Sequence, residues 1–281
     1  MKRTALLLSL LLPLAACNQN APASSDASTP APASSAPSAA AEAAAASTAA
    51  GAAPAASAGT SAEVPPAANP AADAAVAAVA DSAAKGAALM PGTDYDQIQG
   101  GQPFEPLNGK VEVVEVFGYV CPACAGFEPL LSAWKKTLPP DVRLTYVPAA
   151  FAAEWIPYAH AFYVSDSQGL VDKTHAAIFN AIHIAKTLPG EGKKPDEAAI
   201  AAFYAKYGAD PKQFLDAMHS FAVDAKLNHA KQFLLHSGVV GTPTIVVDGK
   251  YRVLGKSYED ILRITNQLIA QERAAGAGAR Q

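Results

Sequence analysis

Cys121 and Cys124 are the residues of this 281-residue chain whose type and spacing most directly indicate chemistry. Two thiols in a Cys-x-x-Cys pattern can form a disulfide with each other and exchange it with other thiols. Pro122 follows Cys121, and Pro favours the first position of a helix, so we expect Cys121 at the N-cap and Cys124 one turn inside. The helix dipole and the unpaired backbone N–H groups there favour thiolate over thiol. The motif therefore predicts a redox-active pair in which Cys121 is the more reactive thiol.

Three other interpretations of the motif stay open from the residues alone. The pair could be a purely structural disulfide, although a disulfide seldom closes so small a loop, or it could be two inert thiols. It could also be half of a zinc site, which would need two further ligands from the six scattered His residues. His175 and His183 lie eight residues apart with no placed carboxylate beside them. We therefore expect no metal site and no cofactor, and solvated or core roles for the His residues.

The elements around the motif form a βαβ pattern. Residues Lys110–Phe117 are rich in Val and lie between glycines, which is typical of a strand. Apolar residues then recur at helical spacing from the motif to Trp134, which predicts a helix. We expect Pro129 to kink this helix rather than end it. Residues Asp141–Val147 read as a second strand, and the two strands are expected to be parallel. This arrangement places the dithiol at the carboxyl end of the first strand.

Helical patterns replace strands after the second strand, and strands return near the end of the chain. Thr244–Val247 and Tyr251–Leu254 flank Asp248-Gly249, a strong hairpin-turn dipeptide, and Tyr258–Ile269 has the pattern of an amphipathic helix. Neither half of the sheet could stand alone, so we predict an α/β fold interrupted by a helical insertion. The expected ranges are 91–151 for the first part, 152–236 for the insertion, 237–272 for the second part and 273–281 for a disordered tail.

The first residues have the features of an export signal. Lys2 and Arg3 precede an apolar run over Ala5–Leu12, which is too short to span a membrane as a helix. The segment Leu14-Ala15-Ala16-Cys17 also resembles a bacterial lipobox, in which cleavage before the Cys is coupled to its lipidation. We therefore expect a lipoprotein signal peptide over residues 1–16 and lipidation of Cys17. The alternative is an ordinary signal peptide followed by a chance Cys.

Residues 17–90 are dominated by Ala, Pro and Ser, and every aromatic residue lies at or after Tyr95. Such a composition cannot bury a core, so we expect a disordered tether. From Tyr95 onward, 18 Lys and Arg residues face 19 Asp and Glu residues. A chain so nearly neutral lacks the basic surface that nucleic-acid binding requires, and this class of partner is excluded.

The segment from Phe117 to Glu128, together with Gly241-Thr242-Pro243-Thr244, resembles the DsbA family of periplasmic thiol:disulfide oxidoreductases. The similarity covers about 102–271, and it implies a thioredoxin fold interrupted by a helical domain. It also implies that Cys121 is the exposed attacking thiol and Cys124 the buried resolving thiol. Pro243 matches a cis proline beside the disulfide, and Thr242 matches the residue whose backbone pairs with substrate peptide.

Glu115 lies where the family places a buried acid behind the active site, and it could relay a proton to or from Cys124. A solvated Glu at a sheet edge is the alternative. Two departures from the family pattern concern the surroundings of the dithiol. Ala123, beside Pro122 in the motif, stands where the archetype has His, and a Lys near Tyr146 is missing. Without that His the thiolate loses one stabilising partner, so we expect a less extreme oxidant.

These expectations combine into a membrane-tethered, monomeric disulfide donor that acts on reduced exported proteins. The resemblance implies reoxidation by a quinone-linked membrane partner of the DsbB type. We expect a periplasmic location with a lipid anchor, and Asn18 after Cys17 favours the outer membrane. Two alternatives remain: a periplasmic disulfide reductase or isomerase, and a non-enzymatic lipoprotein binding module whose disulfide is structural.

Overall fold

The computed structural model describes residues 69–278, and their centre is a five-stranded sheet in the order β1-β5-β4-β2-β3. Strand β2 runs parallel to β3 and antiparallel to β4, which confirms the parallel βαβ unit and the late hairpin. Strand β1, antiparallel to β5 at one edge, has only three residues and was not predicted. The strands are Tyr95–Gln97 (β1), Val111–Phe117 (β2), Val142–Pro148 (β3), Thr244–Val247 (β4) and Tyr251–Val253 (β5).

Strand β2, an inner strand between β4 and β3, is buried at every position. Its Val residues favour the extended backbone, and its neighbours β3 and β4 take both rows of its hydrogen-bonding groups. Because helices cover both faces, the strand carries no polar side. Even Glu112 and Glu115 are buried, at 0% and 1% exposure. The alternative of a solvated Glu115 at a sheet edge is therefore wrong.

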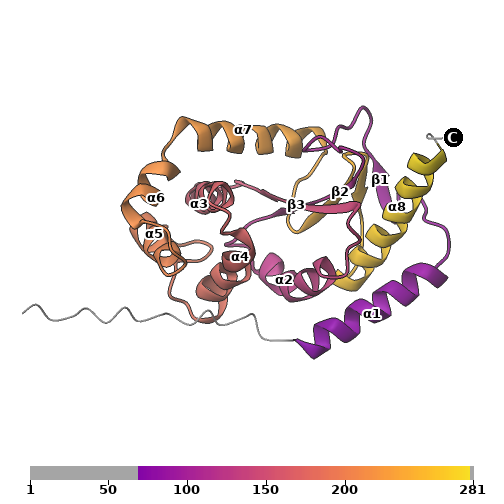
Figure 1. The fold of residues 1–281 in the computed structure, drawn as a ribbon, viewed down its shortest axis with the longest axis horizontal. Coiled ribbons are helices and arrows are strands. Elements are labelled where there is room, and N and C mark those ends of the chain that lie inside the picture. The colour runs from indigo at the N-terminus through magenta and orange to yellow at the C-terminus, as the bar shows by residue number, and fades with distance from the viewer. Residues whose placement is uncertain (1–68, 279–281) are drawn as a thin grey trace, which may run out of the picture. The chain divides into compact units, whose positions relative to one another are not determined.

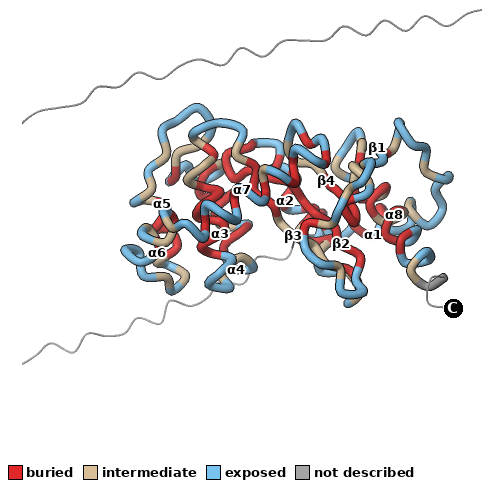
Figure 2. Tube along the Cα trace, turned by 90° about the horizontal axis from the view of Figure 1, so that it is seen from above, coloured by how far each residue is buried: buried red, intermediate tan, exposed pale blue. Residues whose placement is uncertain are grey.

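Helices separate the two halves of the sheet, as the sequence predicted. The insertion helices gather at one end of the molecule, and α7 crosses back over the sheet (Figure 1). Their apolar faces and one side of the sheet enclose one core cluster, while α1, α2 and α8 cover a second (Figure 2). The insertion contains Ala153–Trp155 (η1), Ile156–Ser167 (α3), Val171–Phe179 (α4), the π-helical turn Asn180–Ile184 (η2), Glu197–Ala205 (α5), Pro211–Met218 (α6) and Phe221–His236 (α7).

The two ends of the described chain correct the expected ranges. Residues Pro70–Lys85, expected within the tether, form helix α1, in which the Asn69 side chain accepts a hydrogen bond from Ala72 N–H. Its small apolar face packs against α8 and α2, and Val79 is only 3% exposed. Helix α8 runs over Tyr258–Gly278 and so includes most of the expected disordered tail. An Ala-rich helix needs little volume to pack, which is why composition alone misjudged both segments.

The remaining N-terminal expectations lie outside the described residues. These are the signal peptide over 1–16, the lipidation of Cys17 and the tether up to residue 68. Among residues 69–278, no helix is both long and apolar enough to cross a membrane.

Candidate active site

The dithiol lies at the start of helix α2, Pro122–Lys135, immediately after strand β2. Cys121 is the N-cap with an extended backbone, and Pro122 begins the helix, as the motif predicted. Both thiols are free in this structure. Cys124 is fully buried and Cys121 is 7% exposed, while Pro122 and Ala123 between them are exposed. The expectation that Cys121 is exposed is therefore wrong, although of the two sulfurs that of Cys121 is the more accessible to a reacting partner.

Three side chains from distant parts of the sequence fix the backbone of the motif. The ring of Trp155 packs so closely against Gly118 that a Cβ atom there would lie 2.1 Å from it. His183 Nε2 lies 2.7 Å from the carbonyl oxygen of Tyr119, and the Tyr258 hydroxyl donates to the carbonyl of Ala123 at 2.8 Å. None of these positioning contacts was found from the sequence, because they join residues 35 or more positions apart.

The loop before β4 lies directly beside Cys121. The peptide bond between Thr242 and Pro243 is cis, as the family resemblance implied. The Cys121 thiol donates to the carbonyl oxygen of Thr242 with an Sγ-to-oxygen distance of 3.6 Å. The structure thus brings Thr242 and Pro243 together with a dithiol that lies 118 or more positions away in sequence.

The surroundings of the two thiols shift their pKa values in opposite directions. The pKa of Cys121 is lowered to about 5, first because the Cys124 thiol hydrogen-bonds its sulfur, with smaller effects from the Thr242 side chain and from the backbone N–H groups of Ala123 and Cys124. Partial burial opposes this shift. The N–H groups make no regular capping hydrogen bond to the sulfur, so the neighbouring thiol ranks above the helix terminus as a cause. Burial raises the pKa of Cys124, and Cys121 and the Glu115 charge raise it further. Cys121 is thus the thiolate of the pair and Cys124 the thiol.

A buried acid cluster lies behind the dithiol. Burial, then the charges of Glu128 and Cys121, raise the pKa of Glu115 well above its ordinary value. Glu128, on α2, is 4% exposed, and burial raises its pKa to about 7 against the opposing effects of Ser132 and Lys135. The cluster is completed by His175 on α4, with one side-chain atom of each of Glu115, Glu128 and His175 within 4.8 Å of the others.

Glu128 and His175 were missed as site residues. Glu128 lies on the helix after the motif, where its position in the sequence does not reveal that it is buried. His175 comes from the insertion, which sequence alone could not dock against β2. Of the two roles expected for the His residues, solvated or core, His175 has the core one, but that expectation did not include its carboxylate neighbours.

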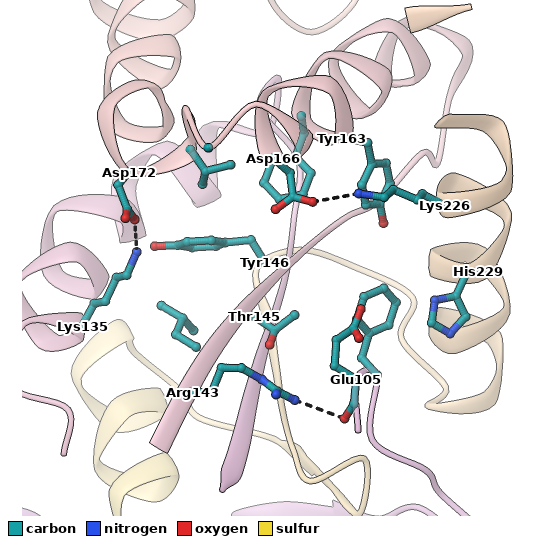
Figure 3. A pocket seen from close by; sticks show the side chains of 15 residues that line it. Glu105, Lys135, Arg143, Thr145, Tyr146, Tyr163, Asp166, Asp172, Lys226 and His229 are labelled. Carbon is teal, nitrogen blue, oxygen red and sulfur yellow. Dashed lines mark hydrogen bonds and ion pairs between the residues drawn. The ribbon is translucent and has the colours of Figure 1, made fainter. Parts of the chain in front are cut away.

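A cavity of about 430 Å³ lies beside β3, between the sheet and the insertion (Figure 3). It is lined by aromatic side chains and by charged ones that already have partners. Lys135 pairs with Asp172 at 2.7 Å, and Lys226 pairs with Asp166 at 3.0 Å. Neither cysteine lines it, so it is separate from the dithiol.

Comparisons with known proteins show which family the chain is similar to. Residues 112–264 match the family profile described as a DSBA-like thioredoxin domain. The chain is 36% identical over 192 residues to the thiol:disulfide interchange protein DsbA of Pseudomonas syringae pv. tomato, covering 67% of this chain and 87% of that protein. It is 41% identical over 173 residues to the protein of that name from Azotobacter vinelandii, covering 59% and 77%.

A solved structure extends the agreement to three dimensions. The crystal structure of the oxidoreductase DsbA from Xylella fastidiosa superposes with a TM-score of 0.63 at 44% identity. It covers 66% of this chain and 98% of that one. The expected fold class, an α/β thioredoxin fold interrupted by a helical insertion, is confirmed.

Proposed function

Because the chain belongs to the family of DSBA-like thioredoxin domains and is a thiol:disulfide oxidoreductase, we propose that Cys121 and Cys124 form the disulfide that it donates to reduced exported proteins. The observation that carries this proposal is that two neighbouring thiols at the start of α2 have pKa values shifted in opposite directions, that of Cys121 lowered and that of Cys124 raised. A stabilised thiolate in the reduced state makes the disulfide a good oxidant.

The reaction follows from the two environments. A client thiolate attacks the Cys121 sulfur, the bond between the two cysteine sulfurs breaks, and its electron pair goes to Cys124. Glu115 supplies the proton that Cys124 needs, because a buried thiolate is costly there. A second client thiolate then attacks the client sulfur of the mixed disulfide and releases Cys121 as a thiolate. The client is oxidised to a disulfide, the enzyme is reduced, and of the two protons the client loses, one replaces that of Glu115 and the other enters solvent.

Thr242 and Pro243 present a backbone edge beside the reacting sulfur. The Thr242 carbonyl is the group that a client backbone N–H would meet next to Cys121. Pro122 and Ala123 leave that approach open because they are exposed and carry no bulky polar side chain. The absence of a cation at Ala123 is consistent with a less extreme oxidant than the family archetype.

Single-cysteine variants test the assignment of the two thiols. In Cys124→Ala, Cys121 can still join a client but nothing resolves the adduct, so mixed disulfides should accumulate as reducible high-mass bands on non-reducing gels. In Cys121→Ser no such bands should form. Adducts that form through Cys124 instead would overturn the assignment.

The redox potential separates donation from the alternative activities. A donor has a potential above the glutathione range, a reductase well below it, and a structural disulfide resists reduction across that range. We expect a potential above the range, measured by equilibrium with glutathione buffers. A potential below it would favour the reductase, and no exchange at all would favour the binding module.

We further propose a periplasmic, monomeric enzyme that is anchored through lipid on Cys17 and reoxidised by a DsbB-like quinone-linked membrane protein. The support is the lipobox-like segment before Cys17 and the oxidising compartment that disulfide donation requires. Cys17→Ser should move the protein from the membrane fraction to the soluble periplasm with unchanged exchange activity. Equal amounts of variant and wild type in the soluble fraction would refute the anchor. Analytical ultracentrifugation of the soluble variant tests the monomer.

A further inference from the structure

The buried acid cluster includes the imidazole of His175, which has no role in the exchange steps described above. His175 Nε2 lies 3.6 Å from Glu128 Oε2, and both side chains are 5% exposed. Among the described residues, neither atom has a hydrogen-bond partner, and the same holds for Glu115 Oε2. Three buried polar atoms without partners converge here, although leaving such a group unpaired is ordinarily destabilising. Unpaired buried polar atoms in a folded protein call for an explanation, and proton transfer at the adjacent dithiol is one.

The hydrogen bond between Tyr119 and His175 favours the tautomer of His175 that carries its proton on Nε2, the nitrogen facing Glu128. The Tyr119 hydroxyl lies 2.9 Å from His175 Nδ1. A hydroxyl that donates to Nδ1 leaves the imidazole proton on Nε2, which then points a donor at the carboxyl group of Glu128. The other tautomer would set a nitrogen lone pair against carboxylate oxygens. The geometry therefore favours a chain of donors from Tyr119 through His175 to Glu128.

We infer that His175 is a positioning residue for disulfide exchange, whose Nε2–H stabilises on Glu128 the negative charge that remains after Glu115 gives its proton to Cys124. This inference rests on the proposed function. The proton passes from the Glu115 carboxyl to the Cys124 sulfur, and the proton of Glu128 then passes to Glu115. Glu128 is left as the carboxylate and faces the imidazole.

The surroundings of the cluster agree with this direction of charge movement. The pKa of Glu128 is about 7, so it still holds a proton in part of the molecules at neutral pH, whereas burial keeps Glu115 protonated well above that. Burial, then the charge of Lys135, lowers the pKa of His175 to about 3, so it acts as a neutral donor.

The groups that face the cluster come from four elements. Glu115 lies on β2 and Tyr119 follows it; Ser132 donates to Glu128 Oε1 at 2.6 Å on α2, where Lys135 also lies. The Tyr146 ring of β3 packs over His175 with 4.1 Å between the ring centroids. Tyr146 and Lys135 also line the cavity (Figure 3). On α4, Asp172 neutralises Lys135.

The test is the titration of Glu128 in the full-length protein, followed by NMR of ¹³C-labelled Glu carboxyl carbons assigned with Glu115→Gln and Glu128→Gln. In His175→Phe, which keeps a ring in the aromatic surroundings, the pKa of Glu128 should rise by more than one unit. The single-turnover rate constant for oxidation of a reduced peptide at pH 6 should fall about tenfold, as one pKa unit corresponds to a factor of ten. His175→Gln keeps an N–H donor and should restore most of both.

His219→Gln is the matched control, because His219 is exposed and pairs with Glu197 away from the cluster. It should leave both readouts unchanged. If His175→Phe does not fold, Tyr119→Phe leaves the imidazole in place but frees its tautomer, and the pKa of Glu128 should again rise. An unchanged Glu128 titration in either folded variant overturns the inference. A wild-type protein that fails to oxidise the peptide overturns the proposed function instead, because the titration is measured without a client.

Discussion

Reduction of the Cys121–Cys124 disulfide should change the stability of the folded chain in a direction that depends on pH. The pKa of Cys121 in the folded, reduced protein is about 5, whereas an unfolded Cys has a pKa of about 8.5. A lowered pKa contributes stability that is complete above the unfolded value and is lost as the pH falls through the folded value. The reduced form therefore gains stability between pH 5 and pH 8.5 as the pH rises.

The magnitudes decide which form is more stable. At pH 7, two units above the folded pKa, the thiolate contributes roughly 2.7 kcal/mol, and at pH 8 about 4 kcal/mol. The disulfide restricts the unfolded chain, and for a loop of four residues this is worth about 2 kcal/mol to the oxidised form. The reduced form should thus be more stable by about 2 kcal/mol at pH 8 and less stable by about 0.5 kcal/mol at pH 6. The two stabilities should cross near pH 6.5.

Equilibrium urea denaturation of both redox forms, at half-unit intervals from pH 5.5 to 8, measures this difference. Comparison at the same pH cancels the groups that titrate alike in both forms. The variant Cys121→Ser/Cys124→Ser has neither thiolate nor disulfide, and its stability should be unaffected by reductant at every pH. An oxidised form that remains the more stable one at pH 8, or a difference that does not vary with pH, would refute a stabilised Cys121 thiolate and the donor mechanism built on it.

Three further predictions concern reactivity and packing. Iodoacetamide should alkylate Cys121 with a midpoint near its lowered pKa of about 5, measured by mass spectrometry across pH 4–9; an ordinary thiol profile would contradict it. Glu115→Gln should slow single-turnover oxidation of a reduced peptide about 100-fold, because an amide cannot protonate Cys124; an unchanged rate constant would remove Glu115 from the mechanism. Val79→Ala should lower the free energy of unfolding by about 2 kcal/mol through lost burial between α1 and α8, measured in urea, and a change near zero would mean that α1 does not stay docked.

The sequence alone determined the local features of this protein, because each depends on neighbours within a few positions. The β-branched run before Gly118 predicted β2, Pro122 after Cys121 predicted the helix start, and Asp248-Gly249 predicted the hairpin turn. Both turn residues indeed have positive φ, 50° at Asp248 and 65° at Gly249. The Cys-x-x-Cys spacing together with the family resemblance was enough to predict thiol:disulfide chemistry.

Tertiary structure alone decided how that chemistry is tuned. Glu115 is buried because helices cover both faces of β2. The pattern of polar and apolar residues along one strand does not show whether its second face is covered. His175 reaches Glu128 only because the insertion docks against α2, a contact between residues 47 positions apart. Helix α1 was not predicted because its Ala and Val side chains are too small to indicate a buried face by themselves. The helix is stabilised where those side chains pack against α8. Contacts of this kind depend on chain closure over long distances, and local pattern does not encode them.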